Sequence, residues 1–167
     1  MRKYEQHNST LGGIDANLLA LLCYLAASVI SFIPVLSYIA WLAPLVVFFL
    51  EKESGLVKFH SMQAFILGLA GGILKGILSI IVGIITAVGT AATVIFGGYG
   101  SFVGGVAISA LIAVAINIVI LVFAIIAMVK AYKNEEYNIP LVGKLTRWVL
   151  GKFPPANNQG YDVSNFQ

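Results

Sequence analysis

Apolar residues form three long runs along the chain, and short polar segments separate them. The runs cover residues 18–50, 59–96 and 106–129. A helix needs about 20 apolar residues to cross a bilayer, because it rises about 1.5 Å per residue and the hydrocarbon core is about 30 Å thick. The third run therefore fits one crossing, whereas the first and second runs are too long for one upright helix.

A proline divides the first run. Pro34 lies near its middle, and proline removes a hydrogen bond from a helix and clashes with the preceding turn. The sequence therefore predicts two short helices at residues 17–32 and 35–50, joined by a tight turn. Pro44 is expected to kink the second of them. Both helices are short for complete crossings.

The second and third runs predict one helix each. Residues 60–90 predict a long third helix, and residues 106–130 predict the fourth. The glycine-rich stretch between them, residues 97–105, has the composition of a loop. The expected fold class is all-α, an integral membrane four-helix bundle over residues 17–131 with a C-terminal interfacial amphipathic helix.

That last helix lies in residues 132–153, which are expected to form a cytoplasmic amphipathic segment. Its apolar residues fall on one face, and the helix can lie on an anionic surface. The polar N-terminal segment 1–16 is also placed in the cytoplasm, and the tail 154–167 is expected to be disordered. The residues predicted to contact the membrane surface are Lys144, Arg147 and Trp148.

Charge changes this picture by excluding a water-soluble domain and setting an orientation. Only 10% of the residues are charged, against about 25% in soluble domains. Nine of the ten basic residues fall on one side of a four-span arrangement whose two termini are cytoplasmic, as the excess of Lys and Arg in cytoplasmic loops requires. The tenth is Lys75. The net charge is +3, but it does not indicate a nucleic-acid partner, because the basic residues flank apolar segments as membrane topology requires. The expected partner is the lipid bilayer.

Small residues recur at four-residue spacing in the third and fourth helices. Such stripes let two helix backbones approach closely in lipid. They are expected to pack two helices together, either within one chain or between copies. The stripes are Ala64, Gly68, Gly72 and Gly76 in the third helix, and Gly105, Ser109, Ala113 and Asn117 in the fourth.

Lys75 is the unusual residue, because it lies within the apolar part of the third helix. An ammonium near the bilayer centre costs about 2.5–3.5 kcal/mol on insertion scales. Lys75 and Asn117 are each about 20 Å from the cytoplasmic ends of their helices, counted at 1.5 Å per residue. We therefore expect them to meet. Two alternatives remain: Lys75 extends toward an interface, or the pair is only structural.

The start of the third helix carries the densest polar cluster. His60 and Gln63 share a helix face there, and a loop holding Glu51, Lys52 and Lys58 precedes them. The simplest interpretation is that these side chains hydrogen-bond the preceding loop. No metal site is expected, since no second His or Cys lies at ligand spacing, and His7 lies in a segment expected to be mobile.

No nucleophile and base arrangement, paired carboxylates or phosphate loop occurs in the sequence. The chain is therefore expected to be no enzyme and to bind no cofactor. The lone cysteine, Cys23, excludes an intrachain disulfide.

Two stretches resemble a family of small four-span prokaryotic membrane proteins. They are Phe48-Phe49-Leu50-Glu51-Lys52 and Val57-Lys58-Phe59-His60-Ser61-Met62-Gln63-Ala64. That family is similar to the 20-kilodalton-class subunit of the translocon at the chloroplast inner envelope. The resemblance covers about residues 17–143. It implies a multi-pass protein of the prokaryotic cell membrane with a translocon-like role, although the Gly-rich third helix and Lys75 depart from the family pattern.

Three functions follow as expectations. The first is a non-enzymatic subunit or scaffold of a membrane assembly, with a membrane-protein partner or a second copy, linked by the resemblance to peptide or protein translocation. The second is a small oligomeric channel or transporter in which Lys75 lines the pathway. The third is an immunity or stress protein that acts against membrane-active peptides.

Overall fold

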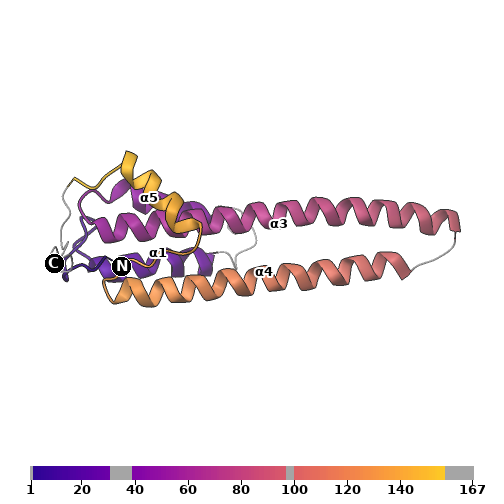
Figure 1. Ribbon diagram of the computed structural model, residues 1–167, viewed down its shortest axis with the longest axis horizontal. Coiled ribbons are helices and arrows are strands. Elements are labelled where there is room, and N and C mark those ends of the chain that lie inside the picture. Colours follow the sequence, from indigo (N-terminus) through magenta and orange to yellow (C-terminus); the bar gives the residue numbers. More distant parts are fainter. Residues whose placement is uncertain (1, 31–38, 97–99, 157–167) are drawn as a thin grey trace. The chain divides into compact units, whose positions relative to one another are not determined.

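The computed structural model describes residues 2–30, 39–96 and 100–156, and within them it is all-helical (Figure 1). It contains no strand there, and two isolated β-bridges join Lys3 to Glu135 and Asn8 to Asp15. The elements in chain order are α1 (Ala16–Ile30), a short 3-10 helix η2 (Ala40–Leu42), α2 (Ala43–Leu50), α3 (Gly55–Phe96), α4 (Gly100–Tyr132) and α5 (Val142–Lys152).

The first apolar run folds as α1, η2 and α2. Of the predicted second helix at residues 35–50, residues 35–38 lie outside the described set, and within that set η2 begins at Ala40 and α2 at Ala43. The predicted break at Pro34 lies outside the described residues. Pro44 does not kink a helix, and the prediction was wrong in this respect. It lies in the first turn of α2, where its missing N–H has no partner to lose and its fixed φ suits a helix start.

Both long helices extend beyond their predicted bounds. α3 begins at Gly55, before the predicted start at residue 60, because Glu51 and Ser54 cap its first turn. α4 begins at Gly100, so the glycine-rich stretch is not all loop. Glycine is a weak helix breaker in an apolar setting, where an unpaired backbone group costs several kcal/mol.

The chain divides into two compact units, Met1–Leu69 with Val122–Gln167, and Ala70–Leu121. In the first unit, one apolar cluster joins the N-terminal segment to α1, the start of α3 and the end of α4. Its buried members are Tyr4, Ala16, Leu19, Ala20, Leu56, Val57 and Ala131.

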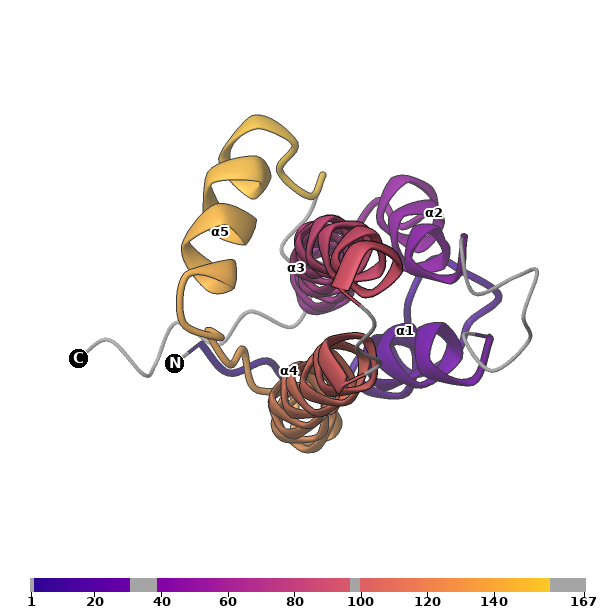
Figure 2. The ribbon, with the colours of Figure 1, turned by 90° about the vertical axis from the view of Figure 1, so that its right-hand side faces the viewer.

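A second cluster in this unit joins α2, α3 and α5. Phe48, Met62 and Ile66 are buried, and Val142 and Val149 of α5 pack against them. α2 and α5 thus both lie against the first turns of α3 (Figure 2). Gly143 and Thr146 of α5 are buried and Val142 and Val149 are partly buried, so this face of α5 is turned inward and the opposite face outward.

The N-terminal segment is ordered, contrary to the expectation that His7 lies in a mobile region. Tyr4 N donates to Asn134 O at 2.9 Å, and Glu136 N donates to Arg2 O at 2.9 Å. The Ser54 hydroxyl lies 2.8 Å from His7 Nε2. These bonds hold the segment across the loops that precede α3 and follow α4.

The second unit consists of two helical arms, residues 70–96 of α3 and residues 100–121 of α4. Most of the large apolar side chains described along these arms are exposed. Two helical stretches in the described residues are long and apolar enough to cross a membrane, Gly55–Ala91 and Ala110–Tyr132. α1 has 15 residues and is shorter than a full crossing requires.

Candidate functional site

His60 is the centre of a buried hydrogen-bond network in the first unit. It lies on the second turn of α3, and no part of it is exposed. Its Nε2 lies 3.1 Å from the backbone carbonyl oxygen of Glu135, in the loop after α4. Its Nδ1 lies 3.2 Å from the Tyr24 hydroxyl of α1. One imidazole therefore connects three segments that are far apart in the sequence.

The partners of His60 fix where its proton lies. A carbonyl oxygen can only accept, so Nε2 carries the hydrogen and donates to Glu135 O. Nδ1 is then the acceptor, and the Tyr24 hydroxyl donates to it. The Tyr24 oxygen in turn accepts from Gln63 Nε2 at 3.1 Å. With both ring nitrogens engaged, His60 acts as a fixed connection between helices.

Gln63 completes the network and is also fully buried. Its Oε1 has no hydrogen-bond partner among the described residues. A buried amide oxygen without a partner is uncommon and costly in proteins.

The expectation that His60 and Gln63 bond the loop before α3 was wrong, as their hydrogen-bond partners show. They bond α1 and the loop after α4, because the start of α3 is enclosed by those elements.

Glu51 closes the start of α3 from the other side. Its Oε1 accepts from Ser54 N at 2.9 Å and from the Thr10 hydroxyl at 2.8 Å, and its Oε2 accepts from Thr10 N at 3.1 Å. Ser54 Oγ accepts from Val57 N at 3.2 Å. A carboxylate is well placed here, because the first backbone N–H groups of a helix lack partners within the helix.

Two further carboxylates form ion pairs after α4. Glu136 is buried and accepts from the Tyr4 hydroxyl at 2.6 Å and from Arg147 Nη2 at 3.0 Å. Glu135 pairs with Lys130 at 2.7 Å and with Lys3 at 3.3 Å. The hydrogen bond from Lys130, with a further contribution from Lys3, holds the pKa of Glu135 below its ordinary value.

The two lysines predicted in this polar cluster, Lys52 and Lys58, take no part in the hydrogen-bond network around His60. Lys52 is exposed, and its backbone carbonyl accepts from Ala156 N at 2.8 Å. Lys58 is half-buried, with its Nζ 5.2 Å from the centre of the Phe48 ring.

Three hydrogen-bonded residues of the first unit were not predicted from the sequence: Tyr4, Tyr24 and Glu136. A tyrosine within an apolar run was the available signal, since a buried hydroxyl needs a partner.

Lys75 and Asn117 lie together in the second unit. Lys75 Nζ is 3.5 Å from Asn117 Oδ1, at the long limit of a hydrogen bond, and both residues are exposed. Asn117 Nδ2 donates to Ala113 O at 2.9 Å. The ammonium therefore has one side-chain acceptor among the described residues and two further N–H groups.

The small-residue stripe of α3 does not pack as one surface. Ala64 is buried, and a Cβ added to Gly68 would lie 2.9 Å from Trp41 Cβ. A Cβ added to Gly72 or Gly76 would meet nothing within 4 Å. The glycine that faces α4 is Gly71, whose added Cβ would lie 2.6 Å from Ile120 Cδ1.

The predicted stripe of α3 therefore does not face α4. α3 is rotated about its axis so that Gly71, and not Gly72, lies against α4. In α4, the side chains at residues 105 and 109 lie outside the described set.

α5 places its three predicted surface residues differently. Lys144 and Trp148 are exposed, as a membrane contact requires. Arg147 is turned back into the protein, where its Nε donates to Asn138 Oδ1 at 2.9 Å and its guanidinium lies over the Phe59 ring. Arg147 thus pairs with the buried Glu136, and its contact with a membrane surface stays a prediction.

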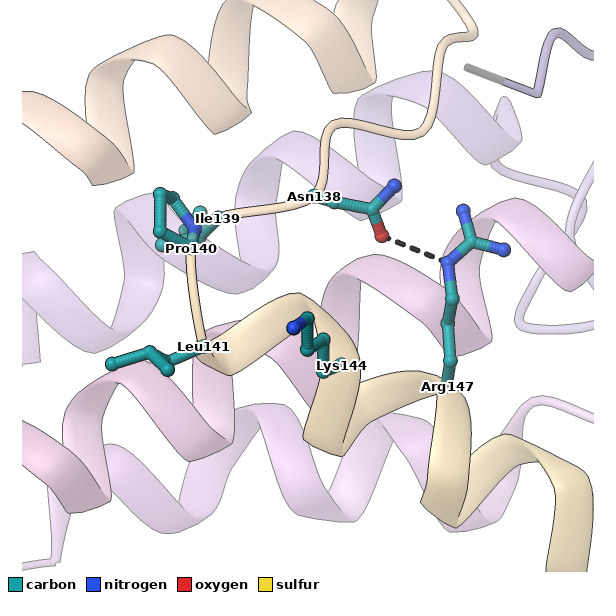
Figure 3. A pocket seen from close by; sticks show the side chains of 6 residues that line it. All are labelled: Asn138, Ile139, Pro140, Leu141, Lys144 and Arg147. Carbon is teal, nitrogen blue, oxygen red and sulfur yellow. Dashed lines mark hydrogen bonds between the residues drawn. The ribbon is translucent and has the colours of Figure 1, made fainter.

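A cavity of about 360 Å³ opens where the chain turns into α5 (Figure 3). Lys144 and the hydrogen-bonded pair Arg147–Asn138 form its polar lining, and apolar side chains form the rest. Its lining residues are Asn138, Ile139, Pro140, Leu141, Lys144 and Arg147. Among the described residues, no group of three or more His, Cys, Asp or Glu could hold a metal ion.

Comparison with known proteins identifies relatives along most of the chain. The sequence model of the magnetosome magnetite crystal formation protein family matches residues 15–146. Two UPF0132 membrane proteins of Methanocaldococcus jannaschii also match. One is 29% identical over 141 residues, 84% of this chain and 74% of the relative. The other is 32% identical over 133 residues, 80% of this chain and 86% of the relative.

No solved structure significantly matches the chain. The relatives support a prokaryotic membrane protein. The relation to the chloroplast translocon stays a prediction.

Proposed function

We propose that this chain, which belongs to the magnetosome magnetite crystal formation protein family, is a non-enzymatic integral membrane protein that serves as a structural subunit of a membrane assembly. The membrane setting is the one that the names of both archaeal relatives state. The scaffold role, the partner and any part in peptide or protein translocation belong to the proposal.

One observation carries the scaffold proposal. The polar side chains at the start of α3 are bonded within the protein, whereas the outward faces of the long helices are apolar. His60 and Gln63 therefore hold helices in place and are not free to bind a substrate. What this fold offers to another molecule is a rigid end and an extended apolar surface, which suit contact with lipid and with other membrane helices.

The experiment is purification of the tagged chain from its native membrane in a mild detergent, followed by mass spectrometry and light scattering. The proposal expects either one partner at a fixed ratio or a defined oligomer. A chain that purifies alone as a monomer, with its thermal unfolding intact, would contradict the scaffold role.

A small oligomeric channel is the second candidate, and Lys75 favours it. Its ammonium is exposed in an apolar arm and keeps two N–H groups beyond the one that reaches Asn117. Charged residues in membrane segments commonly face a water-filled path. Reconstituted vesicles should then pass anions, and Lys75→Leu should abolish that flux while Lys133→Gln preserves it. No flux from the unmodified chain would exclude the channel.

The family description also refers to magnetite crystal formation. A protein that binds an iron mineral through carboxylates would need them free. Glu51, Glu135 and Glu136 are instead occupied by hydrogen bonds and ion pairs from the chain itself. These three carboxylates therefore receive no mineral-binding role, and the proposed membrane role rests on the setting that the names of the archaeal relatives state.

A further inference from the structure

The outward face of α5 combines large apolar side chains with lysines. Leu141 is 82% exposed and Trp148 is 60% exposed, and Leu145 lies between them on the same face. Lys152 Nζ is 4.1 Å from the centre of the Trp148 ring. An aromatic ring beside a lysine at such a position is typical of the boundary between lipid tails and headgroups.

A strained turn holds Leu141 outward. Val142 N donates to Pro140 O at 2.8 Å, which closes a γ-turn, and Leu141 adopts φ 65° and ψ −53°. This conformation is rare and costly for a residue with a side chain. Gly143 allows the turn to pack tightly, because an added Cβ would lie 2.9 Å from Asn138 Cα. The turn therefore directs the large Leu141 side chain away from the protein core.

The cavity beside this turn is both apolar and cationic. Ile139, Pro140 and Leu141 form its apolar side, and the Lys144 side chain is turned toward the Asn138–Pro140 stretch (Figure 3). Residues 138–153 contain three basic residues and no acidic one. Glu136 pairs with Arg147 but no described carboxylate pairs with Lys144. One lysine at the cavity is thus free to bind an anion.

We propose that this cavity and the outward face of α5 bind an anionic phospholipid of the bilayer in which the chain lies. Lys144 binds the lipid phosphate. Leu141 and the adjoining apolar wall contact the upper part of an acyl chain, and Trp148 with Lys152 extends the contact along the helix. The charge complementarity and the mixed lining suit a phospholipid. The inference rests on the membrane setting of the proposed function and is independent of the scaffold role.

The test is native mass spectrometry of the full chain released from nanodiscs made of phosphatidylcholine and phosphatidylglycerol in equal parts. The unmodified chain should retain phosphatidylglycerol in preference to phosphatidylcholine. Lys144→Gln should lower that preference about fivefold, which corresponds to the contribution of one lysine near an anionic surface. Lys133→Gln is the matched control, because it removes an exposed positive charge outside the cavity and should leave the preference nearly unchanged.

Equal retention of the two lipids by the unmodified chain would overturn the proposal. An equal loss in the Lys144 and Lys133 variants would also overturn it, since general surface charge would then explain the preference. Brominated lipids give a second readout through tryptophan fluorescence. In a Trp41→Phe background, Trp148 should be quenched more by brominated phosphatidylglycerol than by brominated phosphatidylcholine. Quenching that does not distinguish the two lipids would count against the site.

Discussion

At the scale of single residues, the polar side chains at the start of α3 are turned inward and bonded within the protein. His60, Gln63 and Glu51 lie in the two stretches that carry the family resemblance, and all three are buried. The sequence could identify these residues as unusual, because polar groups beside apolar runs need partners. It could not identify Tyr24 or the Glu135 carbonyl as those partners, since that pairing depends on how three segments meet.

Removing the imidazole should destabilise the protein. His60→Leu leaves the Tyr24 hydroxyl and the Glu135 carbonyl buried without their partner, which we expect to cost about 1–3 kcal/mol in free energy of unfolding. Tyr24→Phe should cost a similar amount. Because the two residues share one network, their effects should be non-additive in the double variant. Thermal unfolding in detergent measures this, and additive losses would show that the residues act separately.

Glu135 should make stability depend on pH. Its folded-state pKa is lowered by Lys130 first and by Lys3 as well, so its ionised form stabilises the folded state. That contribution is complete above the ordinary glutamate pKa of about 4.3 and is lost as the pH falls through the lower folded-state value. Unfolding followed from neutral to acidic pH should show this loss in the unmodified chain, and Glu135→Gln should reduce the slope in the same range. An unchanged slope would assign the acid sensitivity to other carboxylates.

At the scale of elements, the number and order of the helices follow from the apolar runs, but their ends do not. α3 begins at Gly55 because side chains outside the apolar run cap it. α4 includes Gly100, although glycine is typical of loops in water. The rotation of α3 about its axis could not be predicted from the sequence either. Gly71 and Gly72 are adjacent, and only packing determines which of them faces α4.

Two glycines of α3 should respond differently to alanine. In Gly68→Ala the new Cβ would meet Trp41 Cβ at 2.9 Å, so the backbone must shift, and we expect a loss of about 1–3 kcal/mol. Gly72→Ala adds a methyl group in open space and should leave stability unchanged or slightly raised. The comparison of their melting temperatures checks the register of α3. Equal effects at both positions would place α3 in another rotation.

At the scale of the whole molecule, the apolar composition indicates a membrane protein, and the archaeal relatives carry that name. The number of crossings is still a prediction. α3 and α4 contain the two stretches long enough to cross, while α1 with its 15 residues is shorter than the hydrocarbon core requires. Hydropathy alone could not separate these cases, because a short buried helix and a membrane helix are equally apolar.

Labelling of single cysteines should establish the orientation. In a Cys23→Ala background, a membrane-impermeant maleimide should label Gly98→Cys in intact cells. Lys133→Cys, at the exposed residue after α4, should be labelled only after the membrane is opened. This expectation follows from the predicted orientation, which places nine of the ten basic residues on the cytoplasmic side. Labelling of Lys133→Cys in intact cells would reverse the orientation, and labelling of both would indicate a mixed one.

Hydrogen bonds between residues far apart in the sequence determine the order in which the first unit can fold. Tyr4 binds Glu136, which follows it by 132 residues, and His60 binds the Glu135 carbonyl, which follows it by 75 residues. During synthesis, the Tyr4 hydroxyl and His60 Nε2 therefore cannot form these bonds until residues 135 and 136, which follow α4, have left the ribosome. A chain that stops before residue 135 lacks the acceptors of the Tyr4 hydroxyl and of His60 Nε2. The polar end of the first unit therefore closes only after α4 has been synthesised, which makes these bonds late events in its folding.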